Sequence, residues 1–329
     1  MEQSAVMKSK IEIARNLKGY SFPHKLSSKE ADIIIDKVKN TLSNSKYEFI
    51  LHRKNDLSEI EINALIEMEL IDDNFLESQN AALLINTDKT ICILINGLDH
   101  IKIQVVGNND IKGLYEIGNE IDDILESNLE YAFDKDLGYL TTCPVNVGTG
   151  LKVTNTVHIP SIEKLKQVDD YYKIAHKIGV NFKGVYGKTK SILGSLYKIS
   201  NTIMIGRSEE NIIQSVESIS NDLSKREYES REILKNVHKI DLEDEIFRSL
   251  AILSSARVIT NSELMKCLSN VKLGIEMGYI DDVNLEKVIN FMTGKQPYLK
   301  IISAYDEEDK IERASYIRRE FSLANRNNK

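Results

Sequence analysis

Cysteine is scarce in this sequence of 329 residues, which contains only three. Cys92, Cys143 and Cys267 lie far apart, and none belongs to a Cys-x-x-Cys pair. An odd number of cysteines without paired spacing argues against a disulfide framework and against a structural zinc site. We therefore expect a reduced protein without a bound metal.

Long apolar runs and an excess of positive charge are also missing. Residues 1–16 contain no apolar stretch of signal-peptide length, and no segment approaches the length of a membrane span. The formal net charge is -7, with lysines interleaved among acidic residues, so the composition indicates no surface for nucleic acid. We expect a cytoplasmic protein that binds neither membranes nor nucleic acid.

What the sequence does contain is the pattern of a soluble globular protein, with 42% hydrophobic and 28% charged residues. The alternation of Ile101, Ile103 and Val105 with polar residues is typical of a half-buried strand. The short links between such runs favour an antiparallel sheet over a doubly wound parallel one. The predicted strands are Tyr47–Leu51, Ala81–Asn86, Thr90–Asn96, Ile101–Val106, Lys152–Ile159, Val180–Tyr186 and Ile199–Ile205.

Helical spacing flanks these runs and takes over completely after Asp241. Ser27 with Glu30, and Thr260 with Glu263, have the spacing of capping boxes. Helices are predicted after Ser27, from Glu209 onward, and over Leu57–Ile71, Lys112–Ala132, Ile162–Ile178, Asp241–Ser255, Asn261–Met277, Asn284–Met292 and Glu307–Leu323. The sequence therefore predicts an α+β domain over residues 1–238 and an all-helical C-terminal domain over residues 239–329.

Two short patterns suggest chemistry without establishing it. Gly184–Thr189 looks like a phosphate-binding P-loop, but it has two residues between its glycines where a P-loop has four. Cys143 could serve as a nucleophile with His100 or His158, although the spacing does not show that these residues meet. A buried structural role for the cysteine is the alternative.

Several segments in a fixed order carry a stronger signal. Ser9–Asn16 reads SKIEIARN, Asn96–Lys102 reads NGLDHIK, Gly138–Lys152 contains TCPVNVGTGLK, and Phe182–Lys188 reads FKGVYGK. They resemble the motifs SRxRxxRN, NEEDHxR, TCPxNxGTGLR and RGxxGE of the phosphagen (guanidino) kinase family. Phe247–Ile259 and Cys267–Ile280 look like the helical C-terminal domain of bacterial protein arginine kinases.

The resemblance implies a guanidino-kinase core in which arginines clamp the phosphates of Mg-ATP. Phosphoryl transfer depends mainly on positioning and on cations around the moving group. In this sequence each position that aligns with a clamping arginine is changed, and lysine lacks the planar fork that grips two phosphate oxygens. The degenerate nucleotide-binding positions are Lys10, Glu12, Lys102, Lys152 and Lys183, and His158 is implied beside them.

The positions for the substrate guanidinium are altered as well. The paired glutamates of the family have become Gly97 and Leu98, and a third glutamate has become Lys188. Asn96, Asp99, His100 and Cys143 keep family residues, which makes Asp99 and Cys143 vestigial catalytic candidates. The resemblance also implies a phosphoarginine site near the C-terminus, where this sequence has Asp309, Lys310 and Arg313.

These substitutions predict a catalytically silent or weak pseudokinase that regulates protein quality control. The alternative is an active, ATP-dependent protein arginine kinase in which lysines do the work of the clamping arginines, with Mg-ATP as cofactor. The resemblance further implies a homodimer. It also implies as partners a zinc-binding activator protein, a Clp-type unfoldase–protease and a heat-shock repressor.

Overall fold

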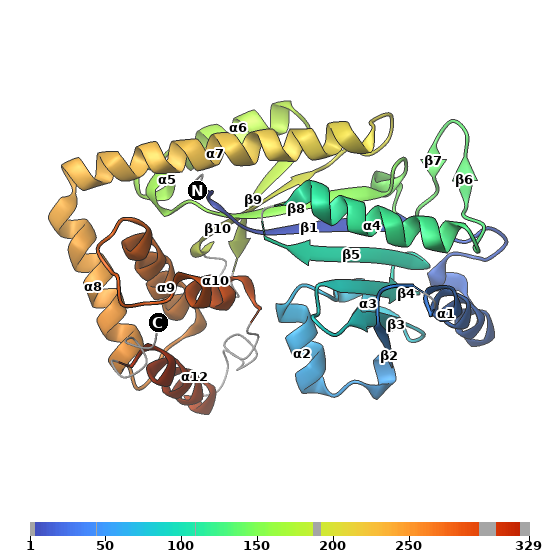
Figure 1. The fold of residues 1–329 in the computed structure, drawn as a ribbon, viewed down its shortest axis with the longest axis horizontal. Helices are drawn as coiled ribbons and strands as arrows, with labels where there is room; N and C mark the ends of the chain where they lie inside the picture. The colour runs from blue at the N-terminus through green and yellow to red at the C-terminus, as the bar shows by residue number, and fades with distance from the viewer. Residues whose placement is uncertain (1–3, 44, 109, 187–191, 296–306, 323–329) are drawn as a thin grey trace.

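The computed structural model describes residues 4–43, 45–108, 110–186, 192–295 and 307–322 (Figure 1). Its centre is an eight-stranded sheet, in which all neighbouring strands pair antiparallel, in the order β2-β3-β4-β5-β1-β8-β10-β9. The predicted α+β fold with an antiparallel sheet is thereby confirmed. The strands are β1 (Val6–Arg15), β2 (Phe49–Arg53), β3 (Ala82–Asn86), β4 (Ile91–Ile95), β5 (Ile101–Gly107), β8 (Leu151–His158), β9 (Val180–Tyr186) and β10 (Ile192–Asn201).

Two strands differ from their prediction. β1 lies in the middle of the sheet, although the sequence marked it only as a motif. The last predicted strand, Ile199–Ile205, is wrong in its bounds, because β10 runs from Ile192 to Asn201 and residues 202–205 follow it as a loop. A small second sheet joins β6 (Phe133–Asp134) to β7 (Gly138–Tyr139).

Helices cover the two faces of the sheet unequally (Figure 1). The apolar side chains of β1, β5 and β8 face the main core, into which α1 (Ser28–Leu42), α4 (Ile111–Glu126) and α7 (Glu209–Val237) pack. On the other face, α2 (Glu59–Glu67) and α3 (Asp73–Glu77) cover β3 and β4 with a separate apolar cluster. The rest of that second face carries the polar residues of the candidate site.

The capping residues predicted from the sequence mark the observed starts of α1 and α9. Ser27 and Glu30 form the expected capping box, and the Thr260 hydroxyl accepts a hydrogen bond from the Glu263 backbone N–H. The predicted helix Ile162–Ile178 is instead two helices, α5 (Pro160–Lys164) and α6 (Val168–Lys177), separated by Lys166 with a φ of 58°. Short 3-10 helices are η1 (Pro23–Lys25), η2 (Lys54–Asp56) and η3 (Pro144–Asn146).

The C-terminal part has its own apolar core, to which α8 (Lys239–Ser255), α9 (Asn261–Glu276), α10 (Leu285–Thr293) and α12 (Glu307–Phe321) contribute. The predicted domain boundary, between residues 238 and 239, falls between α7 and α8. That these two parts are separate domains stays a prediction. The structure ties the two parts together, since Leu234 of α7 packs in this second core. No described helix is long and apolar enough to cross a membrane.

A chain of buried ion pairs reinforces the joint between the two parts. The carboxylate of Glu227 on α7 accepts hydrogen bonds from the backbone N–H groups of Ser161 and Ile162, at the start of α5. Arg231 then links Glu227 at 3.1 Å to Glu276 on α9 at 2.9 Å. Separating these helices would leave a buried charge without its partner, which is energetically costly. The ion pairs therefore hold α5, α7 and α9 in one arrangement.

Candidate functional site

A row of lysines lies on the polar half of the sheet, on the face opposite the main core. Side chains alternate along a strand, so Lys8, Lys10 and Glu12 of β1 point to the same side. Antiparallel register places Glu12 beside Lys152 of β8 and Gln104 of β5, two residues from Lys102. The same register places Lys183 beside Lys198. We call this surface the lysine face: Lys8, Lys10, Lys102, Lys152, Lys183 and Lys198.

Glu12 lies among these lysines and neutralises part of their charge. Its carboxylate is 3.2 Å from the ammonium of Lys10 and 3.8 Å from that of Lys102. Burial would raise the pKa of Glu12, but the charges of Lys10, Lys102 and Lys152 outweigh it and lower the pKa to about 2. Glu12 is therefore ionised at neutral pH, and it places a negative charge where the family resemblance implies a phosphate.

The segment after α2 supplies further oxygens to the lysine face. We call residues Met68–Asp72 the acidic turn. Lys8 donates to the carbonyl of Met68 at 2.9 Å, and Lys10 donates to the carbonyl of Glu69 at 2.8 Å. The carboxylate of Glu69 pairs with Lys198 at 2.9 Å, and that of Asp72 pairs with Lys102. Sequence reasoning missed Lys8, Lys198, Glu69 and Asp72; only Lys8 left a signal, in its alternation with Lys10 and Glu12.

Asp99, a candidate to replace the missing substrate carboxylates, has a structural position. It is buried, and its Oδ1 accepts hydrogen bonds from the Asn16 side-chain amide and the Thr142 backbone N–H, both at 2.7 Å. Neighbouring His100 is also buried, and its Nδ1 accepts from the Leu17 backbone N–H. These bonds fix the loop around Asn96, Gly97 and Leu98 against β1, so the Asp99 carboxylate serves the fold.

Cys143 and His158, the other residues of the motifs, occupy different environments. Cys143 is a free thiol at intermediate exposure directly before η3. His158 is fully buried at the end of β8 and bonds through Nε2 to the Ser269 hydroxyl of α9. Burial and the nearby charges of Lys272 and Arg231 hold the pKa of His158 well below its ordinary value. A neutral, covered imidazole suits the joint with α9 better than contact with a nucleotide.

Arg15 is the motif arginine that this chain retains, and the structure explains its retention. Its guanidinium is buried, donates through Nε and Nη2 to Asp122 on α4, and lies over the Tyr139 ring at 3.5 Å. Its Nη1 donates to the carbonyls of Ala14 and Thr149. Arg15 therefore fastens the sheet to α4 on the face opposite the lysines.

Three of the remaining predicted positions lie on α12 and not on the sheet. Lys188 lies outside the described residues. Arg313 on α12 is fully buried and donates to the carbonyl of Ile259, while the carbonyl of Lys310 accepts from the Ile259 backbone N–H. Asp309 belongs to the same helix. In this arrangement Arg313 and Lys310 fasten α12 to the loop before α9.

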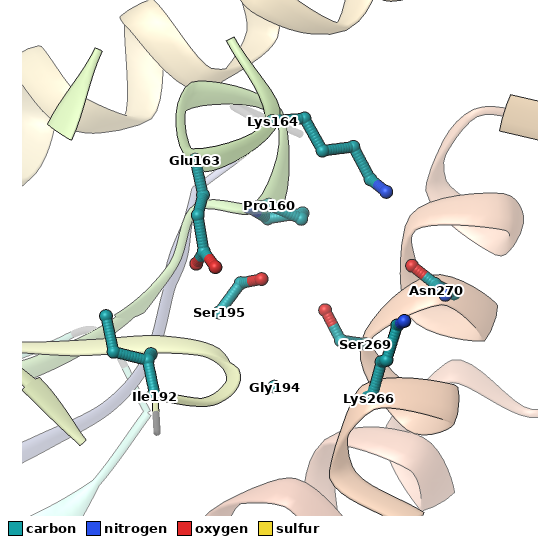
Figure 2. A pocket seen from close by; sticks show the side chains of 9 residues that line it. All are labelled: Pro160, Glu163, Lys164, Ile192, Gly194, Ser195, Lys266, Ser269 and Asn270. Atoms are coloured by element: carbon teal, nitrogen blue, oxygen red, sulfur yellow. The ribbon is translucent and has the colours of Figure 1, made fainter. Parts of the chain in front are cut away.

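A cavity of about 250 Å³ lies at the joint between the two parts of the molecule (Figure 2). Figure 2 shows Glu163 and Lys164 of α5, Ser195 of β10, and Lys266 with Ser269 of α9 around it. Ser269 is also the partner of His158. The cavity shares none of its lining residues with the lysine face, so it is a separate feature.

The chemistry that the lysine face supports is the binding of anionic oxygens. The ammonium groups of Lys8, Lys10, Lys102 and Lys198 already bind carboxylates and carbonyls of the same chain. Within the described ranges, no group of three or more histidine, cysteine, aspartate or glutamate side chains could hold a metal ion. Glu12 places one carboxylate among these lysines, in contact with Lys10 and Lys102.

Comparison with protein families gives matches over most of the chain. Residues 31–230 match the model for the C-terminal catalytic domain of ATP:guanido phosphotransferases. Residues 239–329 match the model described as the protein-arginine kinase McsB C-terminal domain.

Curated proteins similar in sequence are protein-arginine kinases, and solved structures similar in fold are guanidino kinases. A protein-arginine kinase of Clostridium kluyveri is 37% identical, with 97% of this chain and 95% of that protein covered. One of Bacillus subtilis is 33% identical, with coverages of 98% and 91%. Lombricine kinase matches the fold with a TM-score of 0.60 at 21% identity, over 68% of this chain and 66% of that one. The duplicated taurocyamine kinase of Schistosoma mansoni matches with 0.62 at 20% identity, over 76% and 38%.

Proposed function

The chain belongs to the ATP:guanido phosphotransferase family, and we propose that it is a catalytically silent or weak relative of the protein-arginine kinases. The observation that carries the proposal is Glu12, ionised and in contact with lysines on the face where the family resemblance implies the phosphates. Two like unit charges about 4 Å apart repel by about 1 kcal/mol in water and by about 4 kcal/mol at an effective dielectric constant of about 20.

The loss of the arginine fork adds to this repulsion. Each lost bidentate contact to an anion costs on the order of 1.5–3 kcal/mol. Several such losses together exceed the roughly 8 kcal/mol that holds a micromolar ligand, although they are not strictly additive. The lysines recover part of the attraction through charge alone, so weak binding of polyanions is expected to remain.

The substrate side supports the same proposal. Gly97 and Leu98 offer no side-chain acceptor for a guanidinium, and Asp99 is buried in bonds to Asn16 and Thr142. A guanidinium in line with a phosphoryl donor needs a carboxylate that is fixed and accessible. The arrangement around this loop orders β4, β5 and β1 without presenting such a group.

The test of this proposal is direct detection of the product. After incubation with Mg-ATP and an arginine-rich protein, mass spectrometry under conditions that preserve acid-labile phosphoarginine is expected to find no more than a no-enzyme blank. The Bacillus subtilis protein-arginine kinase serves as the positive control. Robust, ATP-dependent phosphoarginine formation by this chain would refute the proposal and establish the alternative, an active kinase that uses lysines.

A silent member of the family must act through partners, and we propose protein quality control in the cytoplasm as its setting. A second copy of the chain is the first partner in this proposal, with the helical part as the interface. Ile240 and Phe247 support it, because they lie on one side of α8 and are 80% and 50% exposed. Val237, at the end of α7, is a further exposed apolar residue close in sequence to α8.

Light scattering at micromolar concentration is expected to report twice the mass of one chain. The paired variant Ile240→Lys/Phe247→Lys is expected to shift the protein to the mass of one chain, because two desolvated ammonium groups oppose the contact. Ile60→Lys, which alters an exposed isoleucine of α2, is the control and should leave the mass unchanged. A monomeric unmodified protein would contradict the dimer.

A further inference from the structure

The acidic turn occupies the lysine face in the way that a bound anion would. Backbone carbonyls of Met68 and Glu69 accept hydrogen bonds from Lys8 and Lys10, and the Glu69 and Asp72 carboxylates pair with Lys198 and Lys102. We propose that the acidic turn is an internal ligand of the lysine face, which keeps polyphosphates out of it. The inference rests on the proposed function in one respect, namely that this face is the former phosphate site.

The lysines stabilise the ionised form of both carboxylates of the turn. Burial alone would raise the pKa of Glu69, but the ammonium groups of Lys8 and Lys198 outweigh it and lower the pKa to about 2. Burial also acts to raise the pKa of Asp72, and Lys102 reverses the effect so that the pKa falls below its ordinary value. Both carboxylates are thus stabilised as anions by the lysines that would otherwise attract phosphate.

The backbone of the turn is shaped for this contact. Glu69 has a φ of 62°, in the left-handed region that a residue with a β-carbon rarely adopts. In that conformation its carbonyl receives Lys10 while its side chain receives Lys198. A conformation that is intrinsically unfavourable persists only where surrounding contacts maintain it, and here the lysines provide such contacts.

The helical part holds the turn from its other side. Lys8 also donates to the carbonyl of Thr293, the last residue of α10, at 3.4 Å. Gly294 follows with a φ of 78°, and a β-carbon at this position would lie 2.4 Å from the carbonyl oxygen of Glu67. The end of α10 therefore packs against Glu67, directly before the acidic turn, and Lys8 joins the turn to α10.

The proposal predicts that removing the two carboxylates makes the lysine face available to a polyanion. The variant Glu69→Gln/Asp72→Asn keeps side-chain length, and asparagine can still cap α3 as Asp72 does. Isothermal titration calorimetry with inorganic tripolyphosphate is expected to show about tenfold tighter binding than for the unmodified protein, since each removed charge had repelled the ligand.

The matched control changes the net charge equally but away from the lysines. Asp73→Asn/Glu77→Gln alters two exposed carboxylates on neighbouring α3, and it is expected to change the affinity by less than about twofold. Equal affinity of the two paired variants, including no measurable binding by either, overturns the proposal. If Glu69→Gln/Asp72→Asn does not fold, Asp72→Asn is compared with Asp73→Asn, and about threefold tighter binding is expected.

This titration is separate from the test of the proposed function. It measures binding of a compound that cannot donate a phosphoryl group to arginine in the assay. Phosphoarginine formation by the unmodified protein would refute the silent kinase whatever the titration shows. Equal tripolyphosphate affinities would refute the internal ligand and leave the absence of catalysis intact.

Discussion

Replacing Arg15 by leucine is expected to lower the free energy of unfolding by about 3–5 kcal/mol, the usual cost of leaving one member of a buried ion pair without its partner. Asp122 would lose the guanidinium that lies 2.6 Å from its carboxylate, in a site where the two side chains are 6% and 5% exposed. The carbonyls of Ala14 and Thr149 would lose their donor as well. Urea denaturation at pH 7 measures the difference.

A second variant separates the ion pair from the packing of the side chain. Arg15→Leu/Asp122→Leu removes both charges, and it is expected to be more stable than Arg15→Leu because no unpaired charge stays buried. Arg53→Leu is the exposed control, since Arg53 and Asp32 pair at 2.6 Å in solvent and should contribute only about 0–1 kcal/mol. An Arg15→Leu protein within about 1 kcal/mol of the unmodified one would contradict the structural role of Arg15.

Replacing Glu12 by glutamine is expected to lower the free energy of unfolding at pH 7 by about 3 kcal/mol. The figure follows from the fall in the pKa of Glu12 from 4.5 to about 2. A carboxyl group with a depressed pKa in the folded state stabilises the fold above its unfolded pKa. That contribution is then lost as the pH falls from 4.5 towards 2.

The pH dependence distinguishes this effect from a general loss of packing. The unmodified protein and Glu12→Gln should differ most above pH 4.5 and converge near pH 2, where Glu12 becomes protonated. Glu69 titrates over the same range in both proteins, so the difference between their curves isolates Glu12. Glu116→Gln, at an exposed position of α4, serves as the control. A constant difference across this range would contradict the assignment.

The elements that the sequence predicted well are those whose determinants are local. Ser27 and Glu30 mark the start of α1 because a capping box needs only residues three apart. Alternation in Ile101–Val105 identified β5, whose apolar residues face a helix layer. β1 was harder, because its exposed side carries Lys8, Lys10 and Glu12, so the segment looked like a charged motif and not like a central strand.

Some residues of the candidate site could be predicted from the sequence, and others could not. Lys10, Glu12, Lys102, Lys152 and Lys183 were found because they align with family motifs. Glu69 and Asp72 lie in a turn that matches none of the motifs quoted above, and their contacts with Lys198 and Lys102 join residues remote in sequence. Only the folded chain brings them together. The same limit applies to Asp99, whose burial and hydrogen bond to the Asn16 amide could not be inferred from its motif.

Helix α7 contributes side chains to both apolar cores, that of the sheet and that of the helical part. Its 29 residues correspond to about 43 Å at 1.5 Å per residue. Ile212 and Val216 lie in the core beside the sheet, and Leu234 lies in the core of the helical part. A chain cut after residue 238 would expose Leu234 and leave Arg231 without Glu276. The C-terminal helices are therefore needed to bury Leu234 and to pair Arg231, whatever catalytic or regulatory task the chain performs.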